Sequence, residues 1–464
     1  MYRSAGKHPV IDQGEQHIGG FTDDDALVHP GPVPAVVFGD HTRCVKFAST
    51  PFVQGADGVK VLAPSPVVCA KYAYWALRHA DIPDKGYARH FATLRTLQFS
   101  LPPSGEQHRI VSAIESYFTR LDYAVTTLER VQRNLKRYRA SVLKAAVEGR
   151  LVPTEAALAR AGGRDYEPAS VLLERILAER RRCWEEAELA KMAQGKAPKE
   201  AKWKAKYVEP VAPDTSELAE LPEGWCWANV DQLTTRVTSG SRDWSQFYGR
   251  GDSIFLMAQN VRPGELDLTF RQVVGPPSED SSCERSQVNK DDLLVTIVGA
   301  NTGNVCRVPT ELSRHYVCQS VALMRLVDPS LSLYVDAYLN SPPGQQVYTQ
   351  FMYGQGRPHL SFANLRETPV PLPPIIEQAR IVEAVGRQLS VADAAIGSIT
   401  IETARCARLR QSILNWAFHG RLVDQDPTDE PAARLLERIR AERESSKANP
   451  PRSPRRMRAR SPRS

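Results

Sequence analysis

Two long stretches of the chain place an apolar residue at every seventh position, which is the spacing of a coiled-coil seam. In each stretch a second apolar row runs three residues ahead of the first. The resulting stripe is too narrow for a globular core, so we expect two long helices that bury each other's stripes. The seam positions are Ile114, Leu121, Leu128, Leu135 and Val142 in the first stretch, and Val385, Ala392, Ile399, Cys406 and Ile413 in the second.

The two stretches are copies of one another. The motif Leu-Pro-Pro-x-x-Glu-Gln-x-Arg-Ile-Val begins at Leu101 and again at Leu372, and Gly-Arg-Leu-Val begins at Gly149 and again at Gly420, so both recur at an offset of 271 residues. Proline suits the start of a helix and glycine suits the left-handed residue that ends one. A helix over 104–148 would be a rod of roughly 65 Å, at ~1.5 Å per residue.

A third block supports the duplication. Residues 167–180 recur at 430–443 with an offset of 263, which a loop shortened by eight residues explains. The chain is therefore a repeat of one unit, in which a long helix is followed by a shorter helical segment.

Elsewhere the pattern changes to short β-rich runs broken by Gly, Pro, Asn and Asp, which predicts two compact domains. The predicted fold class is mixed α/β (α+β), with two domains separated by two long antiparallel coiled-coil helices in a pseudo-twofold arrangement. The predicted segments are a first domain at 1–101, a helix at 102–152, a helical and Lys-rich connector at 153–220, a second domain at 221–372, a second helix at 373–423, a short helical repeat at 424–444 and a basic disordered tail at 445–464.

Net charge does not identify a partner. The chain of 464 residues carries +7, but residues 445–464 contain seven basic and no acidic residues and so supply all of it. The predicted second domain, counted over 222–372, has 12 basic and 15 acidic residues, a net charge of −3. Any face that binds a polyanion must therefore be a local patch, and such binding by the chain alone should be weak and sensitive to salt.

Several classes of protein are disfavoured by what the sequence lacks. The eight cysteines contain no Cys-x-x-Cys pair, so neither a zinc site nor a disulfide framework is expected. No apolar run is long enough to cross a membrane and no signal peptide is recognisable, so we expect a cytoplasmic protein. Phosphate-binding loops, metalloprotease and hydrolase motifs and the Asn/Asp-Pro-Pro-aromatic motif of amino-methyltransferases are also missing, so we expect a chain that is not an enzyme.

A pseudo-twofold object of fixed length suits duplex DNA, whose turns repeat every ~34 Å. The repeated Leu-Pro-Pro and Gly-Arg-Leu-Val motifs, with Leu221-Pro222-Glu223-Gly224-Trp225 and Ser239-Gly240-Ser241, resemble the DNA specificity (S) subunit of type I restriction-modification systems. The resemblance implies two target-recognition domains that each read half of a bipartite sequence in double-stranded DNA. It also implies paired helices that set the interval and dock two methyltransferase (M) subunits, with restriction/translocase (R) subunits completing the complex. S-adenosylmethionine, ATP and Mg are then expected on those partner subunits and not on this chain.

The first domain departs from this pattern. Subtracting 271 from Leu221 puts the matching start about 50 positions before Met1, and the first domain has no Leu-Pro-x-Gly-x-Trp opening. A truncated reading frame, a misassigned start and a naturally shorter domain are the three explanations that we consider.

Candidate DNA-binding residues are those on expected loops that can contact base edges or phosphates. In the first domain they are His41, Thr42, Arg43, Lys60, Arg89 and His90. In the second they are Ser239, Gly240, Ser241, Arg242, Trp244, Gln259, Asn260, Arg262, Asn301, Thr302, Arg357, His359 and Ser361. The candidates for partner docking, inferred from the resemblance, are Glu106, Gln107, Arg109, Glu377, Gln378 and Arg380, for which capping of the first helical turn is the alternative.

Two other functions remain open from the sequence. A coiled-coil adaptor that binds protein partners would explain the seams and the neutral body equally well. An inactive, truncated specificity cassette would explain the short first domain.

Overall fold

The computed structural model describes residues 3–86, 88–193, 201–241, 243–276, 281–354 and 356–448. The chain forms two compact units. Unit 1 comprises Met1–Val131 and Ser398–Ser464, and unit 2 comprises Gln132–Gly397. Each unit contains one α/β domain and parts of both long helices.

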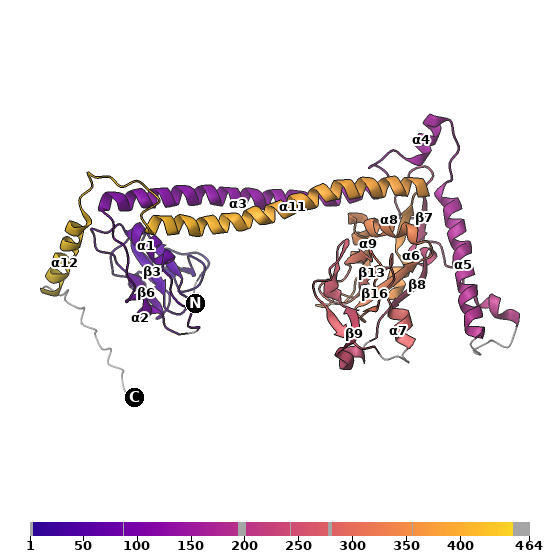
Figure 1. Cartoon of the computed structure of the whole chain (residues 1–464), viewed down its shortest axis with the longest axis horizontal. Coiled ribbons are helices and arrows are strands. Elements are labelled where there is room, and N and C mark those ends of the chain that lie inside the picture. The colour runs from indigo at the N-terminus through magenta and orange to yellow at the C-terminus, as the bar shows by residue number, and fades with distance from the viewer. Residues whose placement is uncertain are drawn as a thin grey trace. The chain divides into compact units, whose positions relative to one another are not determined.

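The long helices are α3 (Ser104–Val147) and α11 (Ile375–Phe418), each of 44 residues (Figure 1). Each begins directly after its proline pair, and each is followed by a glycine with left-handed backbone, Gly149 with φ 67° and Gly420 with φ 68°. After each glycine, a backbone N–H bonds back to a carbonyl of the last helical turn. Both predicted helix starts and both predicted glycine caps are confirmed.

In unit 1, the beginning of α3 packs against the end of α11. Ile110, Ile114 and Phe118 of α3 share a buried cluster with Ile413 and Leu414 of α11. Further along the same pair of helices, Asp122 forms an ion pair with Arg410. The helices are therefore antiparallel here and bury each other's apolar stripe, as predicted.

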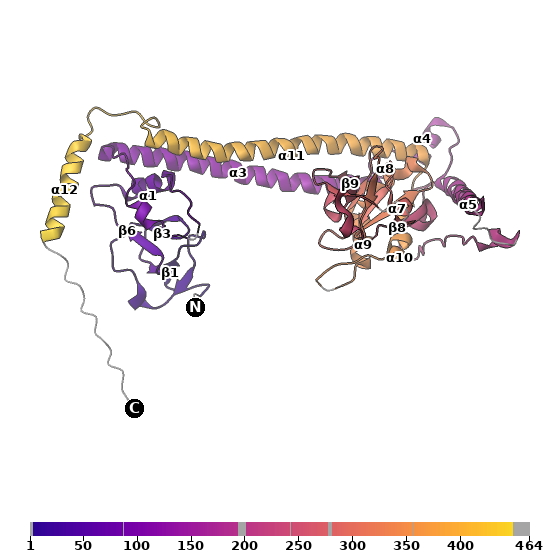
Figure 2. The same ribbon diagram turned by 60° about the horizontal axis from the view of Figure 1, so that its bottom comes forward.

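The first domain, in unit 1, has two small sheets with helix α1 (Ala70–His79) packed beside β3 and β4 (Figure 2). One sheet has the order β2-β1-β5 and the other the order β4-β3-β6. The helix α1 fixes the domain to the coiled coil, because Tyr72 and Trp75 enter the cluster formed by α3 and α11. The remaining bounds are β1 (His8–Ile11), β2 (Gly20–Thr22), η1 (Asp25–Leu27), β3 (Ala35–Gly39), β4 (Val45–Ala48), β5 (Val53–Gln54), β6 (Val59–Leu62) and α2 (Phe91–Leu94).

In unit 2, the end of α3 packs against the beginning of α11. Arg139 forms an ion pair with Asp393, and the Tyr138 hydroxyl donates to Gln388 Oε1 at 3.1 Å. Val142 and Val385 lie in one buried cluster with the second domain. The antiparallel pairing is thus present in this unit as well.

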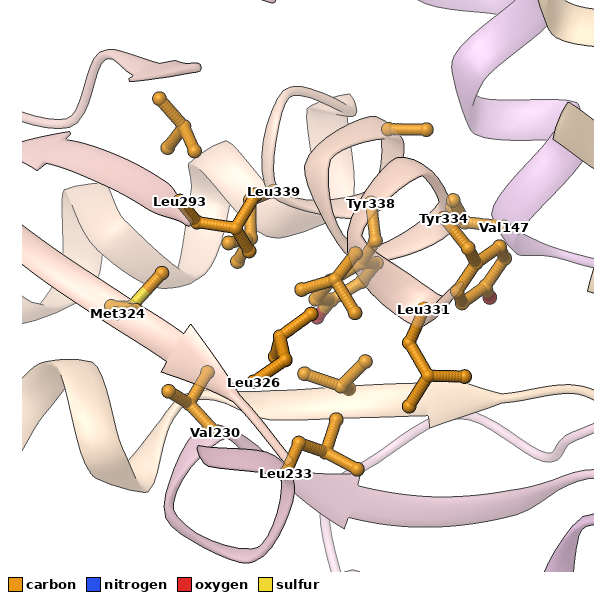
Figure 3. Packing of buried hydrophobic residues seen from close by; sticks show 14 of the residues in the cluster. Val147, Val230, Leu233, Leu293, Met324, Leu326, Leu331, Tyr334, Tyr338 and Leu339 are labelled. Atoms are coloured by element: carbon orange, nitrogen blue, oxygen red, sulfur yellow. The ribbon is translucent and has the colours of Figure 1, made fainter. Parts of the chain in front are cut away.

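The second domain is built on a four-stranded sheet of order β14-β13-β16-β8, beside which α8 and α9 lie (Figure 1). Leu293, Met324 and Leu326 of this sheet meet Tyr334 and Tyr338 of α8 in the main core (Figure 3). A second sheet, β12-β9-β15, has its own core around Trp244 and Phe255, and two pairs, β10-β11 and β17-β7, complete the domain. The bounds are β7 (Cys226–Asn229), α6 (Val230–Leu233), β8 (Thr234–Ser239), η3 (Asp243–Phe247), β9 (Tyr248–Leu256), η4 (Ala258–Asn260), β10 (Val261–Arg262), β11 (Glu265–Leu266), β12 (Gln272–Val274), α7 (Ser281–Ser286), β13 (Leu293–Thr296), β14 (Val305–Arg307), β15 (His315–Val317), β16 (Val321–Leu326), η5 (Pro329–Leu331), α8 (Ser332–Leu339), α9 (Pro342–Phe351), α10 (Phe362–Glu367) and β17 (Pro369–Leu372).

Helical segments follow each long helix. In unit 2 these are α4 (Glu155–Gly162), α5 (Ala169–Ala193) and η2 (Ala201–Lys206), and in unit 1 the segment is α12 (Ala432–Ala448). The helix α12 ends at Ala448 and so includes the first four residues of the tail that we predicted to start at Ser445; residues 449–464 of that tail lie outside the described residues. The mixed α/β class and the antiparallel pairing of the long helices agree with the prediction.

The first turn of α11 is held by a buried carboxylate. Glu377 is fully buried; its Oε1 accepts from Trp225 Nε1 at 3.0 Å and its Oε2 from the backbone N–H of Glu155 at 2.7 Å. Burial raises the pKa of Glu377, and the two hydrogen bonds oppose that rise. Glu377 thereby joins the second domain, the connector and the long helix.

We expect Glu377→Gln to lower the free energy of unfolding of unit 2 by about 1–3 kcal/mol, because an amide leaves one buried N–H facing a donor. Glu106→Gln, at the matching position of α3, is the control, since no hydrogen bond to the Glu106 carboxylate is found among the described residues. Equilibrium urea unfolding measures both, with hydrogen exchange at β7 assigning the transition. Equal losses in the two variants would contradict the role given to Glu377.

Asp336 of α8 should make the stability of unit 2 depend on pH. Burial raises the pKa of Asp336 to about 7, against the opposing effects of Arg307 and of a hydrogen bond from Asn340. The folded chain therefore keeps a proton that the unfolded chain releases above about pH 4, and the free energy of unfolding falls as pH rises from about 4 to about 7.

Asp336→Asn should flatten this slope, whereas Glu311→Gln, at an exposed position, should leave it unchanged. The measurement is urea unfolding at several pH values between 5 and 8. The same slope in the wild-type chain and in Asp336→Asn would rule out this source of pH dependence.

Candidate nucleic-acid interface

Five of the predicted DNA-binding residues of the second domain line one hollow of about 530 Å³. Ser239, Gly240 and Ser241 come from the end of β8, and His359 and Ser361 come from the loop that leads into α10. Hydroxyl groups and backbone amides suit phosphate oxygens, and imidazole can reach a base edge or a phosphate. The fold thus gathers chemistry from two segments more than 100 residues apart in the chain.

The Ser-Gly-Ser turn depends on its glycine. A Cβ atom on Gly240 would lie 1.7 Å from the carbonyl oxygen of Val317, because the end of β8 presses against the chain between β15 and β16. The Gly240 N–H donates to the Cys318 carbonyl at 3.3 Å at the same point. The glycine allows this approach and so puts both serines at the rim of the hollow.

The His359 side of the hollow is held by backbone pairing. His359 forms β-bridges with Val298 and with Tyr353, and its ring stacks on Tyr353 with centroids 5.7 Å apart. The Thr302 hydroxyl donates to the carbonyls of Gly299 and Pro358, which ties the 299–304 loop to the same segment. Thr302 therefore contributes to the hollow by holding the 299–304 loop against the segment that carries His359.

Arg285, Gln319 and Tyr353 also line the hollow and were missed by the sequence reasoning. Arg285 lies on the short helix α7, in a segment with no basic cluster or glycine turn to mark it. Arg285 and Arg357 are exposed and have no ion-pair partner among the described residues, whereas Arg262, Arg307, Arg314, Arg325 and Arg366 are each paired with an aspartate. Arg285 is thus a guanidinium group without an ion pair among the described residues that lines the hollow, on a domain of net negative charge.

Other predicted residues of the second domain are placed differently. Trp244 and Asn260 are buried; Trp244 stacks on Phe255, and Asn260 donates to the carbonyls of Asp267 and Phe270. Gln259 and Arg262 beside Asn260 are exposed, Asn301 is half-buried, and Arg242 lies outside the described residues. Burial keeps Trp244 and Asn260 from direct contact with DNA in this conformation.

In the first domain, the predicted residues are mostly engaged in internal contacts. His90 is fully buried, with Nδ1 3.0 Å from the Asp40 carbonyl, and Arg43 donates to Asp84 and to the Ile82 carbonyl. Thr42 donates to the Gln13 carbonyl, and His41 is half-buried next to it in sequence. Thr42 and Arg89 are exposed and Lys60 is half-buried, and of these three only Arg89 has no side-chain hydrogen bond with the described residues.

Five of the six residues predicted to dock partners make hydrogen bonds or ion pairs within the chain. Gln107 Nε2 donates to the Pro102 carbonyl at 2.9 Å, and Gln378 Nε2 donates to the Pro373 carbonyl at 2.8 Å, so both cap their helix start. Arg109 pairs with Asp429 at 2.7 Å and Arg380 with Glu155 at 2.7 Å. Glu106 and Glu377 are buried. The hydrogen bonds of Gln107 and Gln378 support the capping interpretation, and the docking of partners stays a prediction.

The described residues contain no group of three His, Cys, Asp or Glu side chains placed to hold a metal ion. Burial raises the pKa of the Cys306 and Cys318 thiols, so neither is poised as a thiolate nucleophile. Within the part of the chain that the structure covers, no helix combines the length and apolar character that crossing a membrane requires.

Comparison with known proteins agrees with the motifs. The EcoBI specificity subunit of Escherichia coli, a type I restriction enzyme component, is 27% identical over 374 residues, which cover 76% of this chain and 66% of the relative. The EcoKI specificity subunit of Escherichia coli strain K12 is 24% identical over 368 residues, with the same shares covered. The chain is similar to type I specificity subunits. This confirms the resemblance proposed from the sequence, although the chain spans slightly less than two thirds of the length of these relatives.

The fold is also shared with a solved structure. A chain described under "complex assembly and conformational transition of the type I R-M system" matches with a TM-score of 0.52 and 16% identity, over 89% of this chain and 92% of that one. No protein-family model matches the chain.

Gly240→Ala should destabilise unit 2 by about 2–4 kcal/mol, because the added methyl group collides with the Val317 carbonyl. Gly386→Ala is the control, since Gly386 lies in α11 with no neighbouring atom within 4 Å of an added Cβ, and alanine there should stabilise by up to ~1 kcal/mol. Urea unfolding compares the two variants. A neutral Gly240→Ala would show that the turn is not held against Val317.

Proposed function

We propose that the chain is the non-catalytic DNA-recognition subunit of a type I restriction-modification complex, which reads a bipartite target in double-stranded DNA. The observation that carries the proposal is the duplicated frame, in which each unit joins an α/β domain to an antiparallel part of α3 and α11. The names of the relatives point to the same role, specificity within a type I enzyme.

The chemistry of the hollow supports contact with DNA in the second domain. Arg285 supplies positive charge to the lining, Ser239, Ser241 and His359 supply short polar groups, and the exposed Arg357 lies two residues before His359 in the chain. Arginine is suited to guanine edges and to phosphates, and serine hydroxyls and backbone amides to phosphates. The few available cations favour a subunit that holds DNA firmly only when partner subunits add contacts.

The remaining parts of the complex follow from the same proposal. Two methyltransferase subunits would bind S-adenosylmethionine and modify adenine, and restriction subunits would use ATP and Mg. In this chain, α3 and α11 would set the interval between the two half-sites, since each is unbroken over 44 residues.

We expect the double variant Arg285→Ala, His359→Ala to weaken sequence-specific binding by the chain assembled with its methyltransferase subunit. The loss should be at least about tenfold, since a good base contact is worth about 1–3 kcal/mol. Arg314→Ala is the matched control, because Arg314 is exposed but paired with Asp252. Gel-shift titration at fixed salt, with the target first identified by methylome sequencing, gives the affinities.

Two results would refute the proposal. One is the absence of adenine methylation when the chain is expressed with the methyltransferase subunit. The other is a target sequence that stays the same when residues 221–372 are exchanged for those of a relative. An adaptor protein would give the first of these results.

A further inference from the structure

The two domains share most of their topology. The sheet β2-β1-β5 of the first matches β12-β9-β15 of the second, with one antiparallel and one parallel pairing in each. The order β4-β3-β6 likewise matches β14-β13-β16, with antiparallel pairing throughout. Two tyrosine hydroxyls support the match. Tyr72 of α1 donates to the Ser100 carbonyl at 2.8 Å, and Tyr334 of α8 donates to the Pro371 carbonyl at 2.7 Å. The two accepting residues are separated by 271 positions, the offset of the repeat.

Three consecutive elements of the second domain have no counterpart among the described residues of the first. These are β7, α6 and β8, which precede β9 in the chain. In the second domain, β8 pairs with β16, β7 pairs with β17, and α6 inserts Val230 and Leu233 into the core (Figure 3). Trp225, just before β7, donates to the buried Glu377.

The surfaces that these elements cover in unit 2 are uncovered in unit 1. Strand β6, the match of β16, pairs only with β3 among the described residues. Residues 98–101, the match of β17, form no strand, and Phe99 is 44% exposed whereas its counterpart Val370 is fully buried. Two edges of the first domain therefore lack the neighbour seen in the second domain: the edge of strand β6 and the edge formed by residues 98–101.

An apolar cavity lies between these two edges. It has a volume of about 430 Å³, and Val36, Leu62, Leu94, Phe99 and Ile439 are among the residues that line it. Ile176, the counterpart of Ile439 in α5, is buried in the core cluster that contains Leu233 of α6. The cavity thus occupies the place that α6 fills in the second domain.

The start of α3, beside this cavity, likewise lacks contacts that the start of α11 has in unit 2. Glu106 matches Glu377; it is 5% exposed, accepts no hydrogen bond from the described residues, and lines a further hollow of about 430 Å³ with Tyr72 and Gly420. A Cβ on Gly149 would lie 2.5 Å from Pro222, whereas a Cβ on Gly420 would meet nothing within 4 Å. The Glu106 carboxylate thus opens onto this hollow without a donor among the described residues, at the place that corresponds to the Trp225 indole of unit 2.

The helix α12 shows a third difference of the same kind, at an arginine that has partners in unit 2 and none among the described residues in unit 1. Arg180 of α5 donates to the Thr234 carbonyl at 3.0 Å, which belongs to β8, and to Asp231 of α6 at 3.4 Å. Its counterpart Arg443 lines the apolar cavity and has no hydrogen bond or ion pair with the described residues. We call the surface formed by β6, residues 98–101, Glu106 and Arg443 the open face.

We propose that the open face is a docking site for a strand–helix–strand segment of the same kind as Trp225–Ser239. Its first strand pairs with residues 98–101, its apolar helical turn fills the cavity, its second strand extends β6, and a tryptophan before it donates to Glu106. The segment enters from the amino-terminal side of β1, since the matching elements precede β9. This proposal rests on the comparison of the two units and does not require that the chain bind DNA.

The test uses the full chain and a synthetic peptide of residues 221–239, kept reduced. We expect the peptide to slow hydrogen exchange at β6 and at residues 98–101 and to raise the thermal stability of unit 1. Peptide carrying Trp225→Phe, which keeps an aromatic ring but loses the indole N–H, should bind about tenfold more weakly, as should chain carrying Glu106→Ala. Combining the two changes should cost little more than either alone, because both remove one hydrogen bond.

Glu129→Ala, at an exposed position of α3, is the matched control and should bind the peptide normally. A variant with the same 221–239 segment fused ahead of Met1 should show the same protection without added peptide. Absence of protection in both formats would overturn the proposal. So would protection by peptide carrying Leu233→Asp that equals that by the native peptide, or protection that grows with chain concentration alone, which would assign the face to a second copy.

Discussion

The structure depends on the mutual burial of two narrow apolar stripes. Neither α3 nor α11 could bury its seam within a domain of its own, because a heptad stripe faces one side of a helix and fits a partner helix. All five predicted seam residues of α11 are buried, whereas Leu121, Leu128 and Leu135 in the middle of α3 are half-buried. Large leucines on a two-helix interface keep part of their surface in water.

The domains are attached where each long helix begins. In unit 2, the indole of Trp225 and the backbone of Glu155 meet Glu377, and Arg380 and Arg164 pair with the buried Glu155. Burial acts to raise the pKa of Glu155, and these two arginines hold it below its usual value. In unit 1 the same helix position carries Glu106, and Arg109 pairs with Asp429. The repeated sequence thus gives the same helix start a full set of partners in one unit and a partial set in the other.

For the proposed recognition of DNA, the arrangement of ion pairs matters more than net charge. Five arginines of the second domain are bound to aspartates that position strands and loops, as Arg325 is to the buried Asp292. Those bonds hold the scaffold but remove the charge from contact with a phosphate. Among the arginines without an ion pair in the described part of the domain, Arg285 lines the hollow and Arg357 lies two residues before His359 in the chain, which is consistent with the proposed subunit that needs partners for affinity.

The sequence by itself determined the duplication, the limits of both long helices and the polar segments from which a reading surface could be built. It could do so because heptad spacing, proline starts, glycine caps and repeats are local signals. Only the tertiary structure separated Ser239 and His359, which line one hollow, from Trp244, Asn260 and His90, which are buried. It also added Arg285, which no local pattern marks. Exposure and proximity depend on how distant strands pair, and neighbouring residues in a sequence do not encode that pairing.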